Sequence, residues 1–75
     1  MDWKQLIVTD PETCGGRPRI RDTRLTVEFL LGLKAAGWTE AQILESYPHL
    51  KPEHPQAVYG YAQAILRDES FLPAA

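Results

Sequence analysis

The pattern of apolar and polar residues divides the chain into two halves. From residue 27 onward, apolar side chains recur at the three- and four-residue spacings that are typical of helices. This pattern predicts helices over residues 27–36, 39–47 and 55–67. The last segment has the cleanest apolar stripe, which is formed by Ala57, Val58, Tyr61, Ala62, Ile65 and Leu66.

Residues that favour helix ends support these boundaries. Thr26 and Thr39 are good N-caps, and Thr39 with Gln42 has the sequence of a capping box. Gly37 suits the left-handed position that follows a helix. Pro55 disfavours a helical conformation for the residue before it, so the third helix is expected to begin at Pro55.

Residues 1–26 show no helical period and are rich in Pro, Gly, Thr and Arg. Residues 6–8 are apolar and can form a short strand. Residues 17–27 partly alternate between polar and apolar side chains, which favours short extended segments around a turn at Asp22 and Thr23. The first half is therefore expected to be an irregular or β arm.

The 75 residues are enough for one domain. We expect a single mainly α domain over residues 1–75, with an extended arm (1–26), a three-helix helix-turn-helix unit (27–67) and a tail (68–75). A domain this small buries only about 60% of the surface that its unfolded chain exposes. Because Trp3, Trp38 and Phe71 add large apolar side chains, we also expect a homodimer.

Charge is unevenly distributed, although the chain as a whole has a net charge of −2. Residues 16–24 contain four arginines and one acidic residue, a net charge of +3, whereas residues 25–75 carry −3. Alternate residues of an extended chain lie on one side. Arginines in a row on one side could neutralise DNA phosphates, pair with an acidic protein or form a solvated strand edge. The four arginines are Arg17, Arg19, Arg21 and Arg24.

The polar face of the third predicted helix is a second candidate surface. In a helix-turn-helix domain this helix enters the major groove. Its polar side chains could contact base edges or phosphate, and they are Gln56, Tyr59, Gln63 and Arg67. For the two glutamines alone, a solvated helix face is the favoured interpretation. Glu40 and Glu45 on the preceding helix would repel phosphate if they faced it.

Residues for catalysis or metal binding are few. Cys14 is the only cysteine, so no internal disulfide forms, and Cys14, His49 and His54 are too few for a structural zinc site. Asp10 and Glu12 lie close to Cys14 in the sequence, but no His is placed to activate it, and Gly15-Gly16 does not match a known phosphate loop. We therefore expect no catalytic residues, metal or cofactor.

No apolar stretch approaches the ~20 residues of a membrane span. The first residues also lack a basic segment followed by an apolar run, so no signal peptide is expected. Both observations favour a cytoplasmic protein that does not bind a membrane.

Part of the sequence resembles a known family. The arm resembles the signature of the domain-of-unknown-function family 433 through Asp10-Pro11, Gly16, Pro18, Ile20, Thr23-Arg24 and Val27. The helical half matches it through Gly37-Trp38-Thr39, Ile43-Leu44, Tyr47-Pro48, Leu50 and Tyr61-Ala62. Two positions depart from the pattern: Asp22 replaces a usual Gly, and His54-Pro55 replaces a pair that favours a helix more strongly.

This resemblance implies a homeodomain-like helical domain with a short β arm. Family members are similar to VapB-type antitoxins, which are encoded beside a small PIN-like ribonuclease toxin. The leading hypothesis is therefore an antitoxin-like, homodimeric regulator that binds its own operator DNA and neutralises such a toxin. The alternative is a protein-interaction module that does not bind DNA, and a small enzyme subunit is a weaker third hypothesis.

Overall fold

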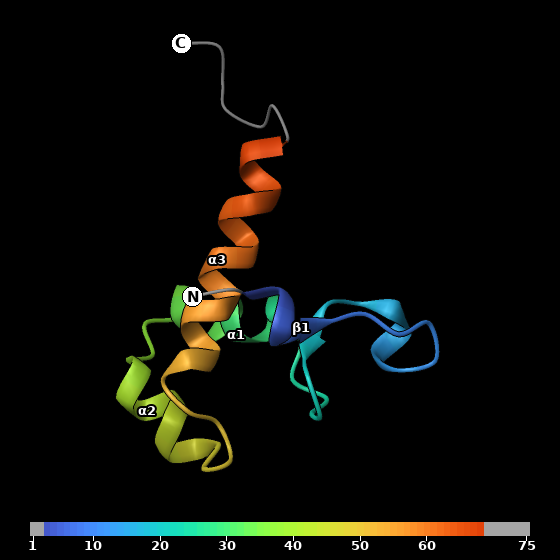
Figure 1. Ribbon diagram of the computed structural model, residues 1–75. Helices are drawn as coiled ribbons and strands as arrows, with labels where there is room; N and C mark the ends of the chain where they lie inside the picture. The colour runs from blue at the N-terminus through green and yellow to red at the C-terminus, as the bar shows by residue number, and fades with distance from the viewer. Residues whose placement is uncertain (1–2, 69–75) are drawn as a thin grey trace, which may run out of the picture.

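Three α-helices follow an irregular N-terminal arm in the structure, a computed structural model in which residues 3–68 are described (Figure 1). The helices are α1 (Val27–Ala35), α2 (Glu40–Ser46) and α3 (Glu53–Asp68). The arm contains two short 3₁₀ helices and two short strands: η1 (Trp3–Gln5), β1 (Ile7–Val8), η2 (Cys14–Gly16) and β2 (Arg19–Ile20). The predicted mainly α fold with a short β arm is therefore confirmed. The predicted tail lies outside the described residues, apart from Asp68.

The arm is held together by backbone hydrogen bonds. Strands β1 and β2 are antiparallel, with Ile7 opposite Ile20. The Ile20 N–H donates to the carbonyl of Leu25 at 2.9 Å, and the Val27 N–H donates to that of Pro18 at 2.9 Å. The extended segments on either side of residues 22 and 23 thus fold back on one another, as the alternating pattern predicted. This turn brings the arm directly to the start of α1.

The predicted helix caps are present. Thr26 Oγ1 accepts a hydrogen bond from the Phe29 N–H at 3.0 Å. The capping box is complete, because Thr39 Oγ1 accepts from the Gln42 N–H at 3.1 Å and Gln42 Oε1 accepts from the Thr39 N–H at 2.8 Å. Gly37 has a φ of +95°, the left-handed conformation expected after α1.

The predicted start of α3 at Pro55 is wrong, because the helix begins two residues earlier at Glu53. Pro55 is then the third helical residue, where its missing N–H would have had no partner within the helix. His54 is helical, and its Nδ1 accepts a hydrogen bond from the Lys51 N–H at 2.8 Å. A side chain in the first turn thus caps the helix and offsets the preference of a residue before proline for extended backbone.

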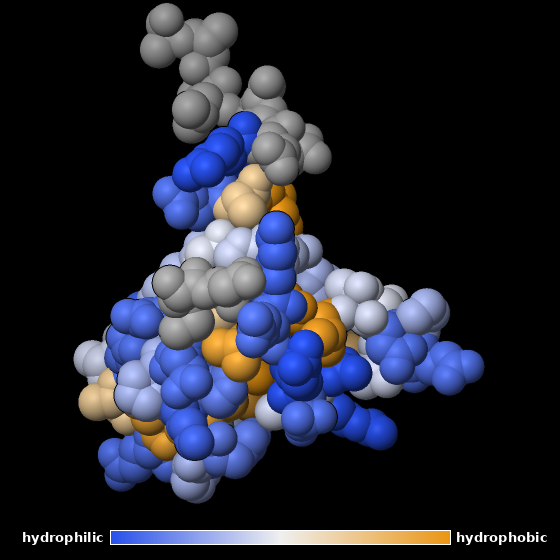
Figure 2. Space-filling view, viewed as in Figure 1, coloured by the Kyte–Doolittle hydropathy of each residue, from blue (hydrophilic) through white to orange (hydrophobic). Residues whose placement is uncertain are grey.

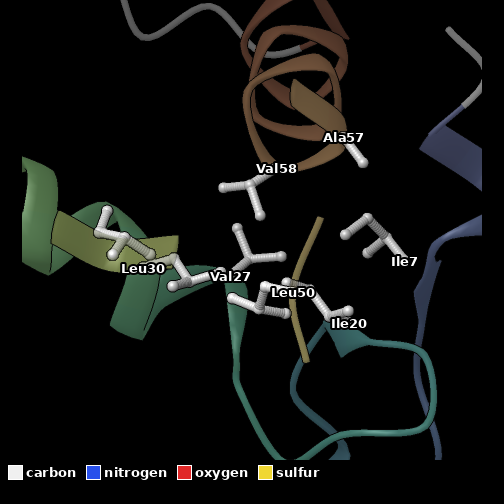
Figure 3. Close-up of a cluster of buried hydrophobic side chains, with 8 residues drawn as sticks. Ile7, Ile20, Val27, Leu30, Leu50, Ala57 and Val58 are labelled. Carbon is white, nitrogen blue, oxygen red and sulfur yellow. The ribbon is translucent and has the colours of Figure 1, made fainter. Parts of the chain in front are cut away.

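Every α-helix and both strands contribute to one hydrophobic core (Figure 3). The helix α3 packs against η1, β1 and α1. The buried members of this core are Ile7, Ile20, Val27, Leu30, Ile43, Leu50, Ala57 and Val58, and Pro55 is buried as well. Trp3 and Trp38 pack against this core, so they are not the uncovered apolar surface that their size suggested.

The apolar stripe of α3 is covered only in its first half. Ala57 and Val58 are buried, whereas Ile65 is 39% exposed and Leu66 is 57% exposed. The C-terminal turns of α3 project beyond the other elements, so the described residues cover this part of the stripe only partly (Figure 1). Apolar atoms are visible on the projecting turns (Figure 2). No helix within residues 3–68 combines the length and apolar character needed to cross a lipid bilayer.

Candidate functional site

The four arginines of the arm have different environments. Arg19 lies in β2 and is half-buried, and its Nη1 donates to the carbonyl of Thr23 at 3.1 Å. Its Nε is buried and has no hydrogen-bond partner among the described residues. Arg19 therefore braces the turn before α1 and does not present its charge freely to a ligand.

The other three arginines are exposed. Arg17 Nη1 lies 3.8 Å from Glu28 Oε1, and the two side chains are 69% and 82% exposed. Arg21 and Arg24 are exposed, and within residues 3–68 no hydrogen bond or ion pair engages their guanidinium groups. The arm thus offers two unpaired positive charges and one loosely paired charge.

The polar residues of α3 share one face, as the sequence predicted. At about 3.6 residues per turn, they lie within roughly a quarter of the helix circumference. All four are exposed, and they are Gln56, Tyr59, Gln63 and Arg67. Arg67 is the one basic side chain of this face.

The electrostatic environment of this face does not favour an anion. Burial and the nearby Glu40 carboxylate raise the pKa of Tyr59 above its usual value of 10.0. Glu40 is the first residue of α2, so an acidic group acts on the face that would meet DNA. A phosphate there would meet this negative charge, with Arg67 alone to offset it.

Arg17 of the arm and the polar face of α3 do not lie on one surface. A shallow groove of about 290 Å³ is lined by both Arg17 of the arm and Tyr61 and Ile65 of α3. Tyr61 and Ile65 lie on the side of α3 opposite Gln63, because helical residues repeat every 3.6 positions. Arg17 is therefore on the far side of α3 from the predicted base-contacting residues.

Cys14 and the histidines do not form a reactive cluster. Cys14 Sγ donates to the carbonyl of Arg24 at 3.5 Å, and His54 caps α3. Within the described part of the chain, no group of three His, Cys, Asp or Glu side chains is arranged to hold a metal ion. Cys14 and His54 thus each take part in a separate hydrogen bond.

Comparison with known proteins places the chain in a family. The family model described as "Protein of unknown function (DUF433)" matches residues 7–62, which is most of the chain. The chain belongs to this family. It is 31% identical over 61 residues to the uncharacterized protein y4eO of Sinorhizobium fredii, with coverage of 81% of this chain and 28% of y4eO.

A crystal structure of another DUF433 protein, from Anabaena variabilis, has the same fold. The two chains superpose with a TM-score of 0.78 at 32% sequence identity, over 84% of this chain and 62% of the other. This chain therefore spans less than a third of y4eO and less than two thirds of the Anabaena protein.

The DUF433 signature residues have structural roles here. Asp10 accepts hydrogen bonds from the Glu12 N–H at 3.0 Å and from the Thr13 hydroxyl at 3.4 Å, which closes a turn. Ile20 is completely buried. The Thr23 hydroxyl donates to the carbonyl of Ile20 at 2.8 Å and accepts from the Leu25 N–H at 3.0 Å. These residues of the signature thus stabilise the fold of the arm.

The exposed side of α1 is a candidate surface that was not predicted from the sequence. Phe29 is 43% exposed, and it lines a shallow groove of about 440 Å³ together with Gly32 and Leu33. Arg17 and Glu28 stand between this groove and the one beside α3. One signal was available, because residues 27–35 are apolar on nearly every side of a helix, whereas a surface helix normally has one apolar face.

Proposed function

We propose that this DUF433 domain is an antitoxin-like binding module that neutralises another protein by holding it along α1. The observation that carries the proposal is the apolar character of α1, whose charged residues are Glu28 and Lys34. A helix that is apolar on all sides is normally buried. Here only Val27 and Leu30 are buried, so a partner protein is needed to cover the remaining sides.

The shape of the exposed side indicates what kind of partner would fit. Phe29 and Leu33 border Gly32, and a Cβ atom built at Gly32 has no neighbour within 4 Å. A large apolar side chain of a partner helix can therefore approach the backbone of α1 at this position. Full burial of an exposed Phe side chain contributes about 1.5–3 kcal/mol. Phe29 is 43% exposed, so a partner that covers it gains less than half of this amount from Phe29 itself.

The antitoxin role follows from the resemblance of DUF433 members to VapB-type antitoxins. The partner class that it implies is a PIN-like ribonuclease toxin encoded by a neighbouring gene, in the cytoplasm. The groove beside Phe29 supports the protein-binding part of this role. The same groove supports neutralisation of the toxin, because a toxin helix or loop bound there would be held away from the substrate of the toxin.

Co-expression with the product of the neighbouring gene tests this proposal. The tagged domain should co-purify with that protein, and Phe29→Glu should lower the affinity at least tenfold. Lys34→Glu is the matched control, because Lys34 is exposed on the same helix but does not line the groove. Unfolding curves of both variants check that the fold is kept. Absence of a complex, or an unchanged affinity of Phe29→Glu, would contradict the proposal.

DNA binding through the arm is a second candidate, and one observation favours it. Arg21 and Arg24 are exposed and have no partner for their guanidinium groups within residues 3–68. Arginines presented in this way can contact phosphates without reading sequence. The acidic neighbour of Tyr59 argues against base reading by α3, so this candidate is confined to the arm.

A further inference from the structure

The groove between α1 and α3 is a second exposed apolar surface, distinct from the groove beside Phe29. Val27 and Leu31 of α1 form one wall of this groove, and Tyr61 and Ile65 of α3 form the other. Val27 is buried, Leu31 and Tyr61 are half-buried, and Ile65 is 39% exposed. Apolar side chains therefore line this groove from its floor to its rim.

The walls of the groove are held by contacts within the domain. The Tyr61 ring packs edge-on against Trp3, with ring centroids 5.0 Å apart and an interplanar angle of 79°. Trp3 belongs to η1, which packs on α3. The groove is thus preformed, which lowers the entropy lost when a partner binds.

Two opposite charges line the same groove. Arg17 and Glu28 are largely exposed, and their closest atoms lie 3.8 Å apart, at the outer limit of an ion pair. An exposed pair of this kind contributes little to stability, because water and salt screen the two charges. Each side chain can therefore exchange its partner with little loss of free energy.

We propose that a second copy of this chain covers this groove in a two-fold symmetric dimer. A two-fold interface must be complementary to itself. Arg17 and Glu28 meet this requirement, because Arg17 of each protomer can pair with Glu28 of the other across the axis. A strongly acidic or basic partner would leave one of the two charges unmatched. This surface goes beyond the proposed toxin-binding role and uses a different side of α1.

The oligomeric state of the full chain tests the dimer. Sedimentation equilibrium from micromolar to millimolar concentration should show twice the monomer mass of 8.5 kDa. Ile65→Glu should weaken the dimer at least tenfold, because it places a charge at the apolar rim. A wild-type protein that stays at 8.5 kDa throughout, or an Ile65→Glu variant with unchanged association, would overturn the proposal.

Charge reversal provides a sharper test of the pairing. Arg17→Glu and Glu28→Arg should each weaken self-association, because like charges would then meet across the axis. Mixing the two variants should restore dimers, since both intermolecular pairs become attractive in the mixed species. An ion pair confined to one chain could not produce this rescue.

The matched control is a mixture of Lys51→Glu and Glu53→Lys. These positions are exposed, lie outside the groove and give the same two net charges. Each control variant should dimerise alone as the wild type does, and mixing the two should not increase the fraction of dimer. If mixing increased dimer formation equally in the groove pair and in the control pair, the proposed pairing of Arg17 with Glu28 would be overturned. A monomeric protein that still binds its toxin through Phe29 would refute the dimer while leaving the proposed function intact.

Discussion

At Arg19, a residue that the sequence assigned to ligand binding is used within the domain. Its guanidinium donates to the Thr23 carbonyl across the turn before α1. A hydrogen bond from a charged group is worth about 1.5–3 kcal/mol, and partial exposure reduces this value. We expect Arg19→Ala to lower the free energy of unfolding by about 1–2 kcal/mol in urea titrations.

Arg21→Ala is the control for this effect. Arg21 is two residues away and exposed, so its replacement should change the free energy of unfolding by less than about 0.5 kcal/mol. Equal destabilisation by the two substitutions would show that general charge in the arm, and not the hydrogen bond of Arg19, stabilises the turn.

Asp22 holds the turn beside Arg19 in a left-handed conformation, with φ of +64°. An L-residue in this conformation has its Cβ close to the carbonyl oxygen, whereas glycine has no such contact. Asp22 stands where the resemblance to the family leads one to expect Gly. We expect Asp22→Gly to raise the free energy of unfolding by about 0.5–1 kcal/mol, because glycine removes the backbone strain. The greater conformational freedom of glycine in the unfolded chain offsets part of this gain.

Asp22→Ala separates backbone strain from charge. Alanine removes the carboxylate but keeps the Cβ, and it tolerates the left-handed region less well than aspartate. Its stability in the same urea titration should not exceed that of the wild type. A gain as large as that of Asp22→Gly would mean that the charge at this turn, surrounded by arginines, is what matters.

At the level of elements, two glycines in and after α1 have opposite roles. Gly37 follows the helix in a left-handed conformation, and the Trp38 N–H donates to the Leu33 carbonyl at 3.0 Å, the pattern of a Schellman cap. Gly32 lies inside the helix, where glycine costs about 0.5–1 kcal/mol relative to alanine. The same substitution should therefore have opposite effects at the two positions.

We expect Gly32→Ala to stabilise the domain by about 0.5–1 kcal/mol and Gly37→Ala to destabilise it by about 1 kcal/mol. Thermal and urea unfolding measure both changes. Gly32→Ala should also weaken toxin binding, because its methyl group enters the groove beside Phe29. A variant that is more stable and binds equally well would place the partner elsewhere on the domain.

Short-range signals explain why the helices could be predicted from sequence. The Thr39 capping box and the Gly37 cap are local chemistry, and both are present as expected. The start of α3 was misplaced because a general preference of residues before proline was applied to His54. The hydrogen bond that His54 accepts from Lys51 exists only once the turn has formed.

The candidate site was harder to predict because it depends on long-range packing. Arg19 lies in a strand, but Arg21 lies in the turn that follows, so the arginines do not form the extended row that their alternation predicted. No local pattern shows that Arg19 contacts Thr23. That Glu40 of α2 acts on Tyr59 of α3 likewise follows from helix packing. The exposed Phe29 was missed because only one face of α1 was considered.

For the whole molecule, the distribution of charge limits what the domain can do with DNA. The chain carries a net charge of −2, and Arg17 of the arm does not share a surface with the polar face of α3. Non-specific DNA affinity is set by the number of phosphates that basic groups neutralise. With Arg19 engaged internally, the arm has three arginines to offer: Arg17, Arg21 and Arg24.

We therefore expect weak DNA binding with no sequence preference. The expected Kd is about 10⁻⁴ M or weaker at physiological salt, which is the weak end of the usual range for non-specific binding. Fluorescence anisotropy with a labelled duplex from upstream of the gene, and with a shuffled duplex, measures both properties. The two duplexes should bind alike. The log–log salt slope should be about −2 to −3, since each phosphate contact contributes about −0.9.

Replacing Arg21 and Arg24 together by alanine should flatten this slope by about 2 and weaken binding to both duplexes alike. The double variant Lys34→Ala with Lys51→Ala removes the same charge from exposed positions outside the arm, so it should leave the slope nearly unchanged. A folded arginine variant with the wild-type slope would remove the arm from the DNA interface. Tight binding to the native duplex alone would show instead that the domain reads sequence, because phosphate contacts cannot distinguish two duplexes of equal length and charge.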